Sequence, residues 1–173
     1  MPVNSAPRAS RPWLKWVAAL GVAGLVVGLA AWAQLGARHA APASLEVVAA
    51  YPHDPDAFTQ GLAVEAGKLY EGTGQYGAST LRRVDLATGR PEKQRELGPR
   101  YFGEGIAILD GVVYQLTWQN GVVVVYDLET FEVERTMEYQ GEGGGLTHDG
   151  RQLIMSDGAA TIRVREPQTF AVT

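Results

Sequence analysis

The feature that most constrains this chain is a β-rich unit that occurs three times. Its best-matched part is a short stretch around one polar position, and the copies read Phe58-Thr59-Gln60-Gly61-Leu62, Phe102-Gly103-Glu104-Gly105-Ile106 and Glu142-Gly143-Gly144-Gly145-Leu146. Gln60, Glu104 and Gly144 occupy the same position, at intervals of 44 and 40 residues. Units of about 40–45 residues with four strands each are typical of β-propellers. The sequence therefore predicts that the three units are blades of one propeller.

Short apolar stretches separated by turn residues fill each unit. The expected strands cover residues 47–50, 61–64, 68–71, 80–84, 106–109, 112–114, 122–126, 133–137 and 153–155. The expected turns include Ala66-Gly67, Asp110-Gly111, Asn120-Gly121 and Asp149-Gly150. Asp-Gly and Asn-Gly between apolar runs are strong hairpin signals. No amphipathic helix pattern follows residue 45, so we predict an all-β domain over residues 46–173, long enough for about three blades.

The N-terminal part has the pattern of a targeting segment. An uncharged apolar run covers residues 16–35 and follows three basic residues, Arg8, Arg11 and Lys15. Twenty residues of helix span about 30 Å, which is the thickness of the hydrocarbon core of a bilayer. We predict one hydrophobic helix here, preceded by a cytoplasmic basic segment at residues 1–15 and followed by a linker at 36–45.

This helix is either a signal anchor or a signal peptide cleaved near Ala31-Trp32-Ala33. The run is long for a signal peptide, which favours the uncleaved anchor. In both cases the positive residues keep the N-terminus in the cytoplasm. Residues 46–173 are then extracytoplasmic, periplasmic or secreted, with membrane attachment through residues 16–35 if no cleavage occurs.

Charge and composition exclude several classes of partner and chemistry. Residues 1–45 carry four of the 15 basic side chains and none of the 19 acidic ones, so the remainder is acidic. An acidic domain does not suit nucleic acid, whose phosphates require a basic surface. The chain has no cysteine, which excludes disulfides, Cys-ligated metals and thiol nucleophiles. His53-Asp54-Pro55-Asp56 is interpreted as a turn rather than a metal site, because proline interrupts it and no partner stands at metal spacing.

Glu104 is the candidate catalytic residue. A lone glutamate of this kind is usually a solvated strand end, but its counterpart Gln60 stands at the same position of the preceding blade. The innermost strands line the channel of a propeller, so these two side chains should face a common space. Phe58 and Phe102 lie two residues earlier on the same strand face. We expect a small pocket in which partial burial raises the pKa of Glu104 towards neutrality, so that it can accept and return a proton.

Several motifs, taken together in their order, resemble the plant and bacterial glutaminyl-peptide cyclotransferases, a five-bladed propeller type of glutaminyl cyclase. They are Phe58-Thr59-Gln60-Gly61-Leu62, Tyr70-Glu71-Gly72-Thr73-Gly74-Gln75-Tyr76-Gly77, Phe102-Gly103-Glu104-Gly105, Leu116-Thr117-Trp118 and Ser156-Asp157-Gly158. The resemblance extends from about Val48 to Phe170. Members of the family convert the N-terminal glutamine of a peptide or protein into pyroglutamate and release ammonia.

The resemblance implies a role for five residues. Glu104 falls on the catalytic acid/base, and Phe58, Gln60, Phe102 and Trp118 fall on substrate-binding positions. We hypothesise that Glu104 moves the proton, that Gln60 and the Trp118 indole N–H hold the substrate carboxamide oxygen, and that the two phenylalanines exclude water. No metal and no cofactor is implied.

Two departures from the family pattern keep a second interpretation open. Gly144 stands where the family has a tryptophan in a Glu-Gly-Trp-Gly-Leu-Thr stretch, so one pocket wall is missing. Residues 46–173 account for about three of five blades, and the later pocket residues of the family have no counterpart, which predicts a C-terminally truncated chain. The alternative is therefore a non-catalytic extracytoplasmic propeller that binds a ligand, or an inactive fragment of a cyclotransferase.

Overall fold

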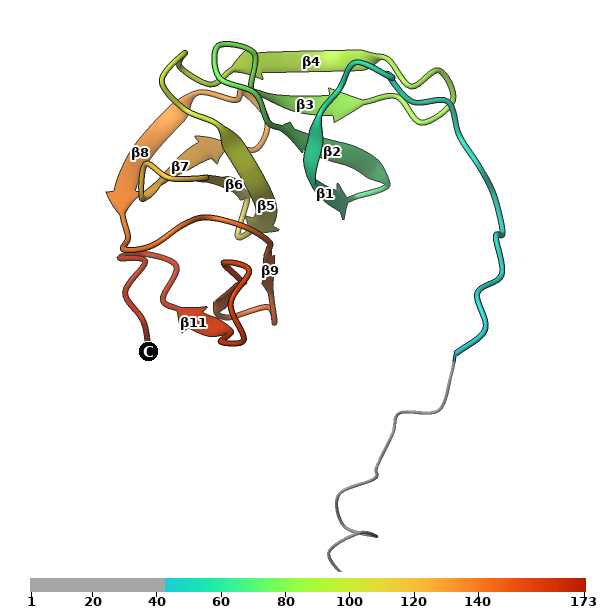
Figure 1. The fold of residues 1–173 in the computed structure, drawn as a ribbon. Helices are drawn as coiled ribbons and strands as arrows, with labels where there is room; N and C mark the ends of the chain where they lie inside the picture. The colour runs from blue at the N-terminus through green and yellow to red at the C-terminus, as the bar shows by residue number, and fades with distance from the viewer. Residues whose placement is uncertain (1–42) are drawn as a thin grey trace, which may run out of the picture. The chain divides into compact units, whose positions relative to one another are not determined.

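Three antiparallel sheets follow one another along the chain in a computed structural model, which describes residues 43–173 (Figure 1). The first sheet contains β1 (Thr59–Glu65), β2 (Lys68–Thr73), β3 (Thr80–Val84) and β4 (Pro91–Glu96). The second contains β5 (Gly103–Leu109), β6 (Val112–Thr117), β7 (Val122–Asp127) and β8 (Val133–Glu138), and the third contains β9 (Leu146–His148), β10 (Leu153–Met155) and β11 (Arg163–Arg165). In each sheet, strands that are consecutive in sequence are neighbours in space.

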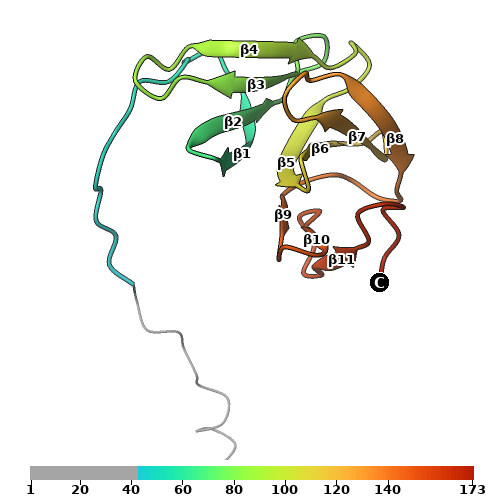
Figure 2. The ribbon, with the colours of Figure 1, turned by 180° about the vertical axis from the view of Figure 1, so that it is seen from behind.

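The first strand of each sheet lies on the inside of the arrangement. β1 contacts β5, and β5 contacts β9, while β4 and β8 lie on the outer side, as both views show (Figures 1 and 2). Repeated up-and-down sheets with their first strands around a common axis are the blades of a β-propeller. The structure confirms the predicted all-β propeller fold. It also confirms the alignment of the first two units, since Gln60 and Glu104 are both the second residue of an innermost strand, whereas Gly144 lies two residues before β9 begins.

The N-terminal predictions fall largely outside the described residues. This is true of the basic segment at residues 1–15, of the apolar run at 16–35 and of most of the linker. Within residues 43–173 there is no helix with the length and apolar character needed to cross a bilayer. From Val48 to Thr173 the chain forms one compact unit.

The predicted hairpin turns are present. Ala66 and Gly67, which connect β1 to β2, both have positive φ angles (49° and 75°), and so do Asp110 and Gly111 between β5 and β6 (53° and 79°). Two consecutive positive φ angles are the hallmark of the type I′ turn, whose twist matches that of the two strands it joins. These dipeptides therefore define where each inner strand ends.

A second kind of turn follows the third strand of every blade. Its first residue is acidic and accepts hydrogen bonds from a threonine three positions later, and its fifth residue has a positive φ. The three copies cover residues 85–89, 127–131 and 166–170. Hydrogen bonds from the turn stabilise each carboxylate and lower its pKa; the threonine contributes most at Asp85 and Asp127, and the backbone N–H of Gln168 contributes most at Glu166. In the last two copies the fifth residue is a buried phenylalanine, Phe131 or Phe170, which enters a core between blades.

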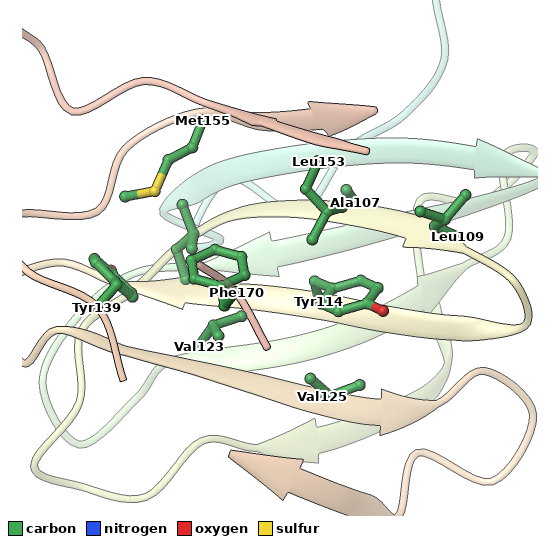
Figure 3. Close-up of a cluster of buried hydrophobic side chains, with 10 residues drawn as sticks. Ala107, Leu109, Tyr114, Val123, Val125, Tyr139, Leu153, Met155 and Phe170 are labelled. Carbon is green, nitrogen blue, oxygen red and sulfur yellow. The ribbon is translucent and has the colours of Figure 1, made fainter. Parts of the chain in front are cut away.

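Two apolar cores hold the blades together. The first and second sheets enclose one core, which is built around Tyr70, Leu81, Ile106, Val113, Val124, Tyr126 and Phe131. The second and third sheets enclose the other, which is built around Ala107, Leu109, Tyr114, Leu116, Val123, Val125, Tyr139, Leu153, Met155 and Phe170 (Figure 3). Burial of this apolar surface is the main force that fixes one blade against the next.

The strand prediction was wrong at residues 47–50, which belong to no strand and pair with none of the described strands. Their apolar composition favours a strand, yet a strand forms only where another edge accepts its hydrogen bonds. Three strands were not predicted: β4, and the short β9 and β11. After Pro91, β4 is polar, and it is almost fully exposed at the outer edge of its sheet, so it lacks the apolar alternation by which strands are recognised.

Candidate active site

Gln60 and Glu104 meet across the first two blades, as the repeat predicted. The amide Nε2 of Gln60 donates a hydrogen bond of 3.1 Å to Oε1 of Glu104. The ladder of each inner strand is interrupted at this point: the register shifts between Thr59 and Gly61 in β1 and between Gly103 and Ile106 in β5. A β-bulge of this kind re-aims the side chain that it contains. The bulges therefore account for how residues on two separate sheets turn towards each other.

Phe102 is the centre of an aromatic wall beside this pair. Its ring lies edge-on to those of Phe58, Tyr76 and Trp118, with centroids 5.9, 5.5 and 5.7 Å away. Such edge-to-face contacts are the favoured geometry for aromatic pairs. Phe58 and Tyr76 are about half exposed, at 50% and 53%. The wall is therefore open to solvent on one side, where a ligand can lie against it.

The environment of Glu104 changes its acidity. Burial raises the pKa of Glu104 to about 7, and the nearby negative charge of Glu142 adds to the effect. Desolvation disfavours the ionised form of a carboxyl group, and a second carboxylate disfavours it further. Near neutral pH the protonated and ionised forms of Glu104 are therefore both well populated. A group in this state is suited to general acid–base catalysis.

Trp118 lies next to Phe102, but its N–H has a partner that was not predicted. The indole Nε1 donates a hydrogen bond of 3.0 Å to Oε2 of Glu142, and Nε2 of Gln119 donates one of 3.1 Å to the other oxygen. In this structure the indole N–H therefore points to the third blade. The predicted contact with a substrate oxygen requires Glu142 to share this N–H with the substrate or to release it. Glu142 occupies the repeat position of Phe58 and Phe102, which is the one sequence signal that marks it.

Gly144, the third member of the aligned set, contributes backbone to this region. Its carbonyl oxygen accepts a hydrogen bond of 2.9 Å from the N–H of Gly105. A β-carbon at position 144 would lie 2.8 Å from the carbonyl oxygen of Ser156, so a side chain here requires the backbone to shift. The third blade thus supplies the Glu142 side chain to the site, and it supplies none at Gly144.

A shallow cavity lies farther along the inner strands. Its lining includes Leu62, Val64, Ile106 and Leu146, and it includes neither Gln60 nor Glu104. Glu65, Thr147 and His148 also line it, so it carries both apolar and polar groups. The Gln60–Glu104 pair and the aromatic wall therefore lie outside this cavity.

Comparisons with known proteins identify the family of this chain. The family model described as glutamine cyclotransferase matches residues 20–173. The chain belongs to the glutamine cyclotransferase family. Over 131 residues it is 43% identical to the glutaminyl-peptide cyclotransferase of Arabidopsis thaliana, an alignment that covers 75% of this chain and 41% of the plant protein.

Solved structures of a glutaminyl cyclase and of another propeller also resemble this cyclotransferase family member. The crystal structure of Myxococcus xanthus glutaminyl cyclase aligns with a TM-score of 0.66 and 38% identity, over 71% of this chain and 52% of that one. The Pan2 WD40 domain of Neurospora crassa aligns with a TM-score of 0.55 at 11% identity, over 66% of this chain and 34% of that one, which is a likeness of fold alone. The chain spans about half the length of the two cyclotransferase relatives.

A polar cluster near the N-terminal end of the propeller unit is distinct from the site. Glu71 is buried, and it accepts hydrogen bonds from the Thr59 hydroxyl (2.6 Å) and from Nε2 of His53 (2.9 Å). Arg82 pairs with Asp54 at 2.9 Å. The segment that contains His53 and Asp54 forms a turn, as predicted, and these contacts fasten it to the first blade. Within residues 43–173, no group of three or more His, Cys, Asp or Glu side chains is arranged to hold a metal ion.

Substitution of Gly105 by alanine is expected to loosen the contact between the second and third blades. A β-carbon at this position would lie 2.4 Å from the Gly144 carbonyl oxygen and 2.7 Å from the N–H nitrogen of Leu146. Because both are backbone atoms, the third blade has to shift, and we expect a loss of about 1–3 kcal/mol in the free energy of unfolding. Urea unfolding measures it, with Gly98→Ala as control, since a β-carbon there meets only the Tyr101 ring at 3.7 Å. Equal stability of the two variants would contradict the close contact.

Proposed function

We propose that this chain carries the proton-transfer site of a glutaminyl-peptide cyclotransferase, and that its substrates are peptides or proteins with an N-terminal glutamine. The observation that carries the proposal is Glu104, half-buried and held by Gln60, two residues after the Phe102 at the centre of the aromatic wall, with a pKa of about 7. Membership of the glutamine cyclotransferase family supports it, as do the names of the Arabidopsis and Myxococcus relatives.

The reaction requires the movement of one proton. The α-amine nitrogen of the substrate attacks Cδ of its own side-chain carboxamide, the new N–C bond closes a five-membered lactam, and the bond from Cδ to the amide nitrogen breaks. The amine loses a proton and the departing nitrogen gains one, so ammonia leaves and no net proton is consumed. Both reacting groups belong to one residue, so a site that holds the folded conformer supplies much of the acceleration.

Glu104 is suited to both halves of this transfer. Its ionised form accepts the proton of the attacking amine, and its protonated form returns that proton to the leaving nitrogen. Oε1 of Glu104 is held by Gln60. Oε2 has no hydrogen-bond partner within the described residues, which leaves it free to face the substrate amine.

The neighbouring side chains position the substrate in this proposal. The amide of Gln60 and the indole N–H of Trp118 are the donors for the carboxamide oxygen, which gains negative charge as the amine attacks. Phe58 and Phe102 pack against the substrate methylenes and exclude water. Both donors have carboxylate partners in the present structure, so the substrate oxygen shares their N–H groups with those carboxylates.

Ammonia release from a glutamine-initiated dipeptide tests the proposal. The matched control is the asparagine-initiated dipeptide, which has one methylene fewer and would have to close a strained four-membered ring. We expect ammonia and a pyroglutamyl product from the first and neither from the second. Saturable binding of the glutamine peptide without ammonia would instead identify the chain as a non-catalytic binding propeller.

We further propose that the propeller unit acts outside the cytoplasm, periplasmic or secreted, or attached to the membrane by residues 16–35. The basic residues followed by an apolar run support this location. Alkaline phosphatase fused after Thr173 is expected to be active in a bacterial host, since that reporter folds only after export. Activity restricted to a cytoplasmic reporter at the same position would contradict the proposal.

A further inference from the structure

The segment that leads into the third blade is joined to the second blade beside the candidate acid. Its Glu142 side chain accepts hydrogen bonds from Trp118 and Gln119, as described above. The N–H of Gly143 donates a bond of 2.7 Å to the carbonyl oxygen of Trp118, and the carbonyl of Gly144 accepts the N–H of Gly105. Residues 142–144 are thus bound both to Trp118 and to the residue that follows Glu104.

From this arrangement we propose that Glu142 is a positioning residue, which locks the Trp118 ring against Phe102 and acts on Glu104 through its charge. The inference deepens the proposed function and rests on it for its catalytic meaning. Glu142 itself is exposed and does not have to touch the reacting atoms. It acts through Trp118 and Glu104, which line the site.

Trp118 needs such a restraint. It follows Thr117, the last residue of β6, and its side chain is only partly buried. Its ring packs edge to face against Phe102, with centroids 5.7 Å apart, and the residue lies outside both apolar cores. The Nε1–H bond to Glu142 has an ionised acceptor, and hydrogen bonds of this type are shorter and stronger than neutral ones. The orientation of the Phe102–Trp118 wall therefore depends on a side chain from the next blade.

The other groups that face Glu104 are neutral, so the charge of Glu142 acts on it without an opposing charge. From β1, Glu104 faces the neutral amide of Gln60. From the segment after β8 it faces Tyr139, whose hydroxyl donates to the Thr117 carbonyl and whose pKa, raised to about 12 by burial, keeps it neutral. Among the described residues, Glu142 is the charged group that raises the pKa of Glu104 beyond the effect of burial. Because Glu142 is exposed, salt screens this interaction.

Two variants of the full chain separate the two effects. Glu142→Gln removes the charge but keeps an oxygen that accepts the indole N–H, so we expect an unchanged Trp118 indole resonance and a Glu104 titration midpoint lower by about half a pH unit, as for a screened charge pair. Glu142→Ala removes both, so the midpoint falls and the indole resonance also moves or broadens. Glu132→Gln, a distant exposed glutamate, is the matched control and is expected to change neither.

The readouts are NMR titration of the side-chain carboxyl of Glu104, assigned with Glu104→Gln, and the indole N–H correlation of Trp118, assigned with Trp118→Phe. Both are independent of turnover, so they distinguish failure of this inference from failure of the proposed function. If both Glu142 variants retain the wild-type midpoint and indole resonance, Glu142 has no positioning role. A shift that disappears in high salt confirms that the charge is the cause.

Discussion

Glu104→Gln is expected to lower the rate of ammonia release by about two to four orders of magnitude, the usual contribution of a positioned acid–base group. Glutamine has the same shape as glutamate and keeps an oxygen for the bond from Gln60, so the geometry of the pair is preserved. It does not accept a proton from the attacking amine or return one to the leaving nitrogen. The measurement is the initial rate with a glutamine-initiated dipeptide, followed across pH.

The stability of the same variant provides an internal control. Burial raises the pKa of Glu104 from 4.5 to about 7, so the folded chain binds this proton more tightly than the unfolded chain does. Stability contributed by the site is therefore present below pH 4.5 and is lost as the pH rises through 7. Glu104→Gln has no charge to bury, and we expect it to be as stable as the wild type in acid and more stable above pH 7 in urea unfolding. A variant that unfolds more easily at pH 8, or that turns over normally, would remove Glu104 from its assigned role.

The repeat carried most of the fold prediction because a propeller reuses one unit. Once Gln60 and Glu104 were aligned, their placement on neighbouring inner strands followed from the register, and the structure shows them in hydrogen-bond contact. The hairpin turns at Ala66-Gly67 and Asp110-Gly111 were predicted from their own residues and are also present. The strand predictions failed where pairing with a neighbouring strand decides whether a strand forms. β4 is a strand because the edge of β3 pairs with it. Residues 47–50 form no strand because no described strand pairs with them.

Only the site residues whose positions follow from strand register could be predicted from the sequence. Phe58, Gln60, Phe102 and Glu104 lie on or next to β1 and β5, and the sequence placed them together. Tyr76 and Glu142 lie in loops, where the direction of a side chain depends on contacts across blades rather than on alternation along a strand. Loop residues contribute to a site through tertiary packing, and no local pattern records that packing.

Leu116→Ala is expected to have the largest effect on stability among substitutions outside the site. The side chain is fully buried in the core between the second and third blades, two residues before Trp118. Removal of a buried leucine side chain leaves a cavity as well as lost apolar burial, and the cost is about 2–5 kcal/mol. Urea unfolding measures it as a lower midpoint at unchanged slope. Leu62→Ala is the matched control because Leu62 is 58% exposed, and we expect a loss well below that of the core variant.

Comparison with Leu81→Ala then tests whether the blades depend on one another. Leu81 is fully buried in the other core, between the first and second blades. Both cores pack against the second blade, which contributes Ile106 to one and Leu116 to the other, so the loss of either core weakens the sheet that carries Glu104. We therefore expect both variants to lower a single cooperative transition. Two separate transitions would show that the blades fold independently, and the alignment of Gln60 with Glu104 would then depend on their own contact rather than on the cores behind them.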